Sequence, residues 1–120
     1  MSFRFQKFPI YINARKLINE IYNLCTTLPK IEEYVIINQL KRSAISILLN
    51  IAEGSMKKSD KEFRRYLLID AGSISEIVAI LDICLDQKYI TSSTHKLFVL
   101  KCQSLITEIY AFSRSLNSAS

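Results

Sequence analysis

The sequence predicts an all-α protein that folds as an up-down-up-down, left-handed four-helix bundle. The chain has 120 residues, an apolar fraction of 49%, and only two glycines and two prolines, a composition typical of a helical globular domain. Apolar residues recur at alternating steps of three and four in four separate stretches, which is the spacing of one helix face. The connections between these stretches are short, so successive helices should run antiparallel within a single domain, residues 1–120.

The first helix should begin at Pro9 and end before Pro29. Proline fixes φ near the helical value and lacks the amide donor that a first-turn residue would leave unpaired. The residue before a proline is disfavoured in helical geometry, so Pro29 should stop this helix. Upstream, Phe3, Phe5 and Phe8 alternate with polar residues. Residues 1–8 are therefore expected to form a short extended arm whose rings dock on the bundle or on a neighbouring subunit.

The second helix should cover residues 31–53, and the third should cover residues 60–87. Gly54 follows the second helix and should take a positive φ just past its last turn. Ser59 and Glu62 have the spacing of a capping box, which starts the third helix. The stop and start signals lie close together, so these two helices should form an antiparallel pair.

Gly72 lies in the middle of the third helix, where glycine costs about 1 kcal/mol relative to alanine. A close backbone approach by a neighbouring helix is the expected compensation. Capping residues at positions 91–94 start the fourth helix, which should continue to about Leu116. The tail, residues 117–120, has nothing to bury and is expected to fray.

The second helix is apolar on two sides, which is more burial than one helix of a small bundle usually needs. The first side consists of Leu40, Ala44, Ile47 and Ile51. The second side, a candidate oligomer interface, consists of Ile45, Leu48, Leu49 and Ala52. Either the bundle wraps this helix tightly or another subunit covers the second side.

Several polar residues should lie between the second and third helices. They are Asn50, Glu53, Asp70, Ser73 and Glu76. The favoured interpretation is a structural polar cluster that caps the connection between the two helices and fixes their register. The alternative is a hydrolase in which Glu53, Asp70 or Glu76 performs acid–base catalysis.

Basic residues should gather at the corner between the second and third helices. The candidate nucleic-acid-binding residues are Lys41, Arg42, Lys57, Lys58, Lys61, Arg64 and Arg65. The formal net charge of +5 and the pI near 9.2 suit an anionic partner without requiring one. No single-strand platform of interleaved aromatic residues is evident at this corner, so contact should be with backbone phosphates. The alternative is an ordinary solvated surface.

Little in the sequence points to catalysis, a metal site or a cofactor. Cys25, Cys84 and Cys102 occupy apolar helix positions, so buried, reduced thiols are expected rather than disulfides or metal ligands. His95 is the only histidine and is expected on the solvated surface. The longest uncharged apolar stretch, residues 43–52, is about half the length of a membrane span. A cytoplasmic protein without membrane contact is the expectation.

The run Ser-Ile-x-x-Asn-Ile-Ala-Glu-Gly at residues 46–54, together with Gly-Ser-x-x-Glu at residues 72–76, resembles a known family. Its members are bacterial four-helix-bundle proteins encoded in intervening sequences of 23S ribosomal RNA genes. They are related to the accessory variability determinant proteins of diversity-generating retroelements. The resemblance covers nearly the whole chain. It implies a homopentameric ring whose basic surface contacts RNA, DNA or a reverse transcriptase, with no enzymatic activity and no cofactor.

Two interpretations of function remain. In the first, the protein is a non-enzymatic oligomer that binds nucleic acid through phosphate contacts. In the second, it is a protein-interaction scaffold, for example an accessory subunit of a reverse transcriptase, without nucleic-acid binding of its own.

Overall fold

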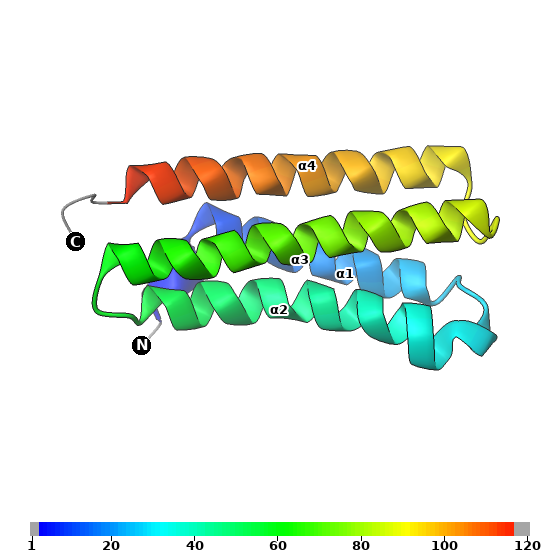
Figure 1. Cartoon of the computed structure of the whole chain (residues 1–120), viewed down its shortest axis with the longest axis horizontal. Coiled ribbons are helices and arrows are strands. Elements are labelled where there is room, and N and C mark those ends of the chain that lie inside the picture. The colour runs from blue at the N-terminus through cyan, green and yellow to red at the C-terminus, as the bar shows by residue number, and fades with distance from the viewer. Residues whose placement is uncertain (1–2, 117–120) are drawn as a thin grey trace.

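A computed structural model describes residues 3–116 as four antiparallel helices that pack sequentially into an elongated bundle of 48 × 26 × 20 Å. The helices are α1 (Pro9–Cys25), α2 (Asn38–Ser55), α3 (Asp60–Asp86) and α4 (Ser92–Ser115). Each reverses the direction of the one before it, and α1 also packs against α4 (Figure 1). The predicted all-α, up-down-up-down bundle is confirmed. The predicted fraying of residues 117–120 lies outside the described residues.

The N-terminal segment docks on the bundle, but it is not extended. Arg4–Lys7 form one turn of 3-10 helix, and the Phe3 amide donates a hydrogen bond of 3.0 Å to the side-chain oxygen of Gln6. The Phe8 ring lies 4.9 Å from the Phe112 ring and 6.2 Å from the Phe63 ring. The sequence pattern missed this local turn, which brings the aromatic rings onto the ends of α3 and α4.

The connection from α1 to α2 departs most from the prediction. After Pro29, Lys30–Glu32 form a 3-10 turn and Glu33–Ile37 form a π-helical turn, so regular α2 begins only at Asn38. The Tyr89 hydroxyl donates a hydrogen bond of 2.9 Å to the carboxylate of Glu32, which fixes the 3-10 turn against the far end of α3. The predicted regular helix from residue 31 is therefore wrong over its first seven residues.

The two glycines play different parts from those predicted. Gly54 lies inside α2 without a positive φ, and a Cβ there would lie 2.8 Å from Tyr66 Cβ and 2.9 Å from Phe63 Cδ1. Gly54 is therefore the position at which α2 and α3 approach each other closely. Gly72 is exposed, and a Cβ there would meet no atom within 4 Å among the described residues. The close approach predicted at Gly72 is therefore wrong.

The predicted caps of the last two helices are present. The Ser59 hydroxyl accepts a hydrogen bond from the Glu62 amide at 3.2 Å, and the Thr91 hydroxyl accepts one from the Thr94 amide at 3.1 Å. Each bond satisfies one of the amides that a helix start leaves without an intrahelical partner. These caps fix the chain reversals at the two ends of α3.

One apolar core runs along the bundle, as the spacing predicts. Its fully buried side chains include Ile21, Leu40, Ile47, Ile51, Leu67, Ile74, Ile77, Leu81 and Ile109. Cys25, Cys84 and Cys102 are free and buried, and desolvation raises the pKa of the Cys102 thiol to about 11. Within residues 3–116, none of the helices combines the length and the apolar character that crossing a bilayer requires.

Candidate nucleic-acid interface

The basic residues that lie together at one end of the bundle surround the connection between α2 and α3. This basic corner consists of Lys57, Lys58, Lys61, Arg64 and Arg65. All are exposed except Arg64, which is half-buried. The N-terminal segment and the end of α4 lie at the same end of the molecule (Figure 1).

Tyr66 organises part of the basic corner. The ammonium of Lys57 lies 5.3 Å from the centre of its ring, and the guanidinium of Arg65 lies 5.6 Å away. Acidic neighbours partly offset both charges: Glu53 lies 3.9 Å from Lys57, and Glu62 lies 3.2 Å from Arg65. Exposed ion pairs of this kind contribute about 0–1 kcal/mol, so both cations remain available to a stronger anion.

Lys41 and Arg42 do not belong to the basic corner, contrary to the prediction. They precede Lys57 by about fifteen residues, so they lie roughly 23 Å away along the helix. The ammonium of Lys41 instead sits 4.9 Å from the centre of the Tyr22 ring, near the opposite end of the bundle. Sequence reasoning also missed Arg4, whose guanidinium donates a 3.1 Å hydrogen bond to the carbonyl of Ser55 beside the corner.

The predicted polar residues form a ladder along the contact of α2 with α3, rather than one cluster at the connection. Glu53 accepts a hydrogen bond of 3.3 Å from the hydroxyl of Tyr66, close to the connection. Half-way along the helices, the hydroxyl of Ser46 donates to that of Ser73 at 2.8 Å.

The ladder continues to Glu76, which accepts hydrogen bonds from Ser43 at 3.2 Å and from Gln39 at 3.3 Å. Glu76 and Glu53 therefore lie at separate rungs, several helical turns apart. The arrangement fixes the register of the two helices and keeps the carboxylates of Glu53 and Glu76 apart.

Asp70 is the unusual member of this ladder. Its side chain is completely buried, and neither carboxylate oxygen has a hydrogen-bond partner among the described residues. Desolvation raises the pKa of Asp70 to about 8. The nearby amide of Asn50 opposes this shift, but it makes no hydrogen bond of good geometry with either oxygen. Asp70 is therefore largely a neutral acid inside the core at pH 7, remote from any substrate in solution.

His95 is more enclosed than predicted. Its side chain is 21% exposed, and Nε2 lies 2.7 Å from Oδ1 of Asp82 across the contact of α3 with α4. The imidazole therefore joins two helices instead of standing alone in solvent. Residues 3–116 contain no group of three or more His, Cys, Asp or Glu side chains placed to hold a metal ion.

The second apolar side of α2 is left partly uncovered in the single chain. Ile45 is 38% exposed and Leu49 is 61% exposed, whereas Leu48 and Ala52 are partly buried against the bundle. The outer side of α3 also carries exposed Leu68 and Ile83. The bundle thus does not wrap α2 completely. The other predicted explanation, that another subunit covers this side, stays a prediction.

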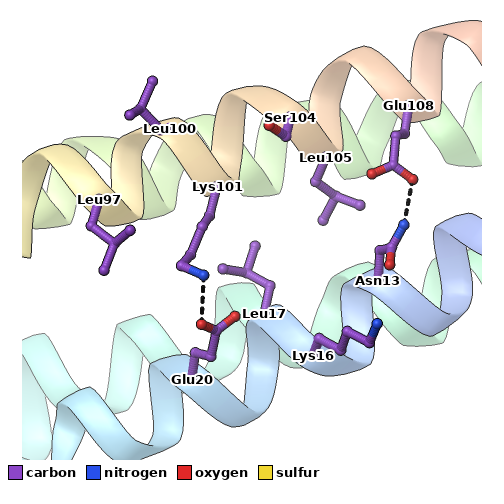
Figure 2. Close-up of a pocket in the computed structure, with 10 residues that line it drawn as sticks. All are labelled: Asn13, Lys16, Leu17, Glu20, Leu97, Leu100, Lys101, Ser104, Leu105 and Glu108. Carbon is purple, nitrogen blue, oxygen red and sulfur yellow. Dashed lines mark hydrogen bonds and ion pairs between the residues drawn. The ribbon is translucent and has the colours of Figure 1, made fainter.

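A shallow groove of about 270 Å³ runs between α1 and α4. Figure 2 shows two polar contacts across it, the ion pair of Lys101 with Glu20 at 2.7 Å and the hydrogen bond of Asn13 with Glu108 at 2.6 Å. The side chain of Leu100 points away from α1 in this view. These contacts close the bundle between its first and last helices.

A larger hollow of about 680 Å³, the end pocket, lies where α1 passes into α2. It is lined by Tyr22, Cys25, Thr26, Leu28, Lys30, Glu33, Tyr34, Ile37, Asn38 and Lys41. The pocket could not be predicted because it depends on the 3-10 and π turns, which carry no strong sequence signal. The pairing of Tyr34 with Asn38 and Lys41 at helical spacing could have indicated a polar face there.

Comparison with known proteins gives one family and one fold. Residues 6–111 match the family described as 23S rRNA-intervening sequence protein. No curated protein matches the chain. A crystal structure of a protein of unknown function from the S23 ribosomal protein family of Bacteroides thetaiotaomicron is similar, with a TM-score of 0.80 and 21% identity. The match covers 88% of this chain and 96% of that one, and at this identity it shows the shared fold. Because the family match spans most of its length, the chain belongs to the 23S rRNA-intervening sequence protein family.

Proposed function

We propose that the protein is a non-enzymatic, cytoplasmic oligomer that binds the phosphate backbone of RNA or DNA through the basic corner. The observation that carries this proposal is the position of Lys57, Lys58, Lys61, Arg64 and Arg65 around one chain reversal. Only Glu53, Asp60 and Glu62 oppose them locally. Lysine and arginine side chains that neutralise phosphates release condensed counterions, which makes such binding favourable and strongly dependent on salt.

Oligomerisation would multiply this modest surface. Ile45 and Leu49 present large apolar side chains on α2, whereas α3 presents exposed Leu68 and Ile69 beside Gly72, which has no side chain. Two different surfaces on one chain favour a head-to-tail contact, and such contacts form a closed ring when the rotation between neighbours allows it. A ring, with five subunits as the family resemblance implies, would repeat the basic corner and raise affinity through multivalency.

The assembly is tested by light scattering coupled to size exclusion, with wild type and a Leu49→Asp variant. Leu49 is exposed in the single chain, so the variant should keep its helical content and lose the oligomer. Leu97→Asp on α4, at a residue of similar exposure, is the matched control and should remain oligomeric. A wild-type protein that elutes as a 13.8 kDa monomer at micromolar concentration would contradict the proposal.

Nucleic-acid binding is tested by fluorescence polarisation with labelled RNA and DNA at low and near-physiological salt. A Lys57/Lys58/Lys61→Glu variant should lose binding, while Lys16/Lys88/Lys96→Glu carries the same charge change elsewhere and should retain most of it. Both variants must remain folded and oligomeric. Equal loss in the two variants would show a general charge effect, and the corner would then be an ordinary solvated surface.

The second candidate function is a scaffold for a protein partner, such as a reverse transcriptase. The exposed Ile45 and Leu49 favour this alternative, since an apolar side of α2 can serve another protein as well as a second copy. The scaffold function replaces nucleic-acid binding as the preferred proposal if wild type is monomeric and binds no nucleic acid at low salt. The scaffold function would then be supported if the protein co-purifies with a reverse transcriptase and the Leu49→Asp substitution abolishes this co-purification.

A further inference from the structure

The end pocket combines a polar rim with an apolar floor. Cys25 and Leu28 are buried at its base, whereas Lys30, Glu33 and Tyr34 at its edge are exposed. Its volume of about 680 Å³ is within the usual range for sites that hold a small organic ligand. The pocket lies at the opposite end of the bundle from the basic corner, so it is a separate site.

Tyr34 offers an aromatic face that the fold itself leaves unused. The residue is 83% exposed, and no other ring or cation of residues 3–116 stacks on it. The second tyrosine of the pocket, Tyr22, already carries the ammonium of Lys41 at 4.9 Å from its ring centre. The ring of Tyr34 is thus available for stacking, whereas the ring of Tyr22 positions the ammonium of Lys41.

The charges that line the pocket suit a ligand with one anionic and one planar polar part. Lys30 and Lys41 are the two cations, and Glu33 is the one acidic residue. An ammonium group is a common ligand of phosphate. The carboxylate of Glu33 and the amide of Asn38 provide acceptors and a donor, which are the groups that read the edge of a nucleobase.

The backbone at this site supports a ligand-binding role. π turns are rare, occur mostly as single turns, and are found frequently at functional sites. Here the turn of Glu33–Ile37 carries Tyr34 toward the side of α2 on which Asn38 and Lys41 line the pocket. The hydrogen bond of Tyr89 to Glu32 joins the preceding turn to the segment that follows α3 and so supports the pocket wall.

We propose that the end pocket binds a nucleoside phosphate, with the base stacked on Tyr34 and the phosphate held by Lys30 and Lys41. The ligand is an unpaired nucleotide of a single strand or a free nucleotide, since both present the same chemistry. For a strand, the inference rests on the proposed function and deepens it: the basic corner holds the backbone of any nucleic acid, and the pocket adds a preference for unpaired bases. A duplex, whose bases are stacked on each other, does not enter.

The first experiment measures polarisation of a labelled single-stranded RNA of about twenty nucleotides and of the matching duplex. Tyr34→Ala should weaken single-strand binding about tenfold, because stacking on an aromatic ring contributes that much per base. Duplex binding should not change. Tyr34→Phe should restore single-strand binding, and Tyr110→Ala, which removes an exposed tyrosine from α4, should have no effect.

The second experiment uses saturation-transfer NMR with adenosine monophosphate and with adenosine. Wild type should show transfer to the base protons of the monophosphate, and Tyr34→Ala should abolish it. Adenosine should bind at least tenfold more weakly, because it offers nothing to Lys30 and Lys41. Binding of the free nucleotide without binding of the oligomer would identify a free nucleotide as the ligand.

The outcomes separate this inference from the proposed function. Suppose that Lys57/Lys58/Lys61→Glu binds RNA as tightly as wild type, whereas Tyr34→Ala binds it more weakly. The proposal for the basic corner is then wrong, and the proposal for the end pocket is supported. If Tyr34→Ala matches wild type with the RNA and with the monophosphate, the pocket proposal is overturned and the corner is unaffected. Equal binding of adenosine and its monophosphate would also overturn it, since the assigned phosphate contact would then be absent.

Discussion

At the end of the bundle where α2 turns into α3, helical geometry is regular up to the reversal, whereas the opposite end joins α1 to α2 through a 3-10 turn and a π turn. The first end is tightly packed: Gly54 brings α2 against Phe63 and Tyr66, and the rings of Phe8, Phe63 and Phe112 lie together. The second end leaves a pocket and a highly exposed Tyr34. One end is tightly packed and carries charge on its outside, while the other is irregular and leaves an open pocket.

The largest effect should come from Asp70, in the tightly packed half. Its folded-state pKa of about 8 lies above the usual value of 3.8, so the folded protein holds this proton more tightly than the unfolded chain. Its contribution to stability is therefore greatest below about pH 4 and falls as the pH rises to about 8. At about 1.4 kcal/mol per pK unit, the total loss should be of order 6 kcal/mol.

Urea unfolding between pH 4 and pH 9 checks this prediction, with Asp70→Asn compared with wild type. As the pH rises, the unfolding free energy of wild type should fall relative to that of the variant, because the amide of the variant does not titrate. Asp86→Asn, at an exposed position of the same helix, is the control and should show no such trend. Parallel pH profiles for wild type and Asp70→Asn would mean that Asp70 is solvated or paired in the folded protein.

The next largest effect should come from Gly54→Val. A Cβ at this position lies within 3 Å of atoms of Phe63 and Tyr66, and the branched side chain adds further atoms to the same contact. Overpacking of this kind costs about 1–3 kcal/mol, so the variant should unfold at distinctly lower urea concentration. A loss below 0.5 kcal/mol, within the range of ordinary surface substitutions, would show that α2 and α3 can move apart without cost.

At the opposite end, Tyr89→Phe should have a local effect. It removes the hydroxyl that holds Glu32, while the ring keeps its contacts with the core. Hydrogen exchange of amides 30–37 should become faster, and exchange in the central turns of α3 should stay as it is. Binding of adenosine monophosphate should weaken in parallel if the fixed turn positions Tyr34. Unchanged exchange at residues 30–37 would show that this hydrogen bond does not hold the turn.

The smallest effect should have the opposite sign. Gly72→Ala places a methyl group in open space on α3, so it should stabilise the monomeric fold by about 1 kcal/mol through helix propensity. Because the proposed ring uses the exposed surface of α3 around Gly72, the added methyl group should also weaken assembly in light scattering. A destabilised fold would contradict the exposed position of this residue.

The regular part of this molecule could be predicted from its sequence. The period of apolar residues gave four antiparallel helices and their core, and Pro9, Ser59 and Thr91 gave three of the helix starts. These signals are local, so they do not depend on what packs nearby. The roles of Gly54 and Gly72 were mistaken because a glycine's neighbours across the helix contact are not visible in the sequence.

The candidate sites were predictable only in part. The basic corner lies within a few consecutive residues, so it follows directly from the sequence, whereas Lys41 and Arg42 were wrongly added to it. The polar ladder pairs residues 27 and 33 positions apart, as with Ser46 and Ser73 or Ser43 and Glu76, and its rungs depend on the exact register of two helices. The end pocket depends on the irregular backbone of residues 30–37, which the helical period of apolar residues does not describe.

The hydrogen bond of Asn13 with Glu108 joins positions 95 residues apart, and it bears on the order in which the chain folds. Closing so long a loop costs more conformational entropy than forming the α2–α3 hairpin, whose connection is only a few residues long. During synthesis α1 emerges first, yet its contact with α4 must wait until the last helix is complete. The hairpin should therefore form the folding nucleus, with the groove between α1 and α4 as the final contact to close, so mutations across that groove should accelerate unfolding and leave the folding rate almost unchanged.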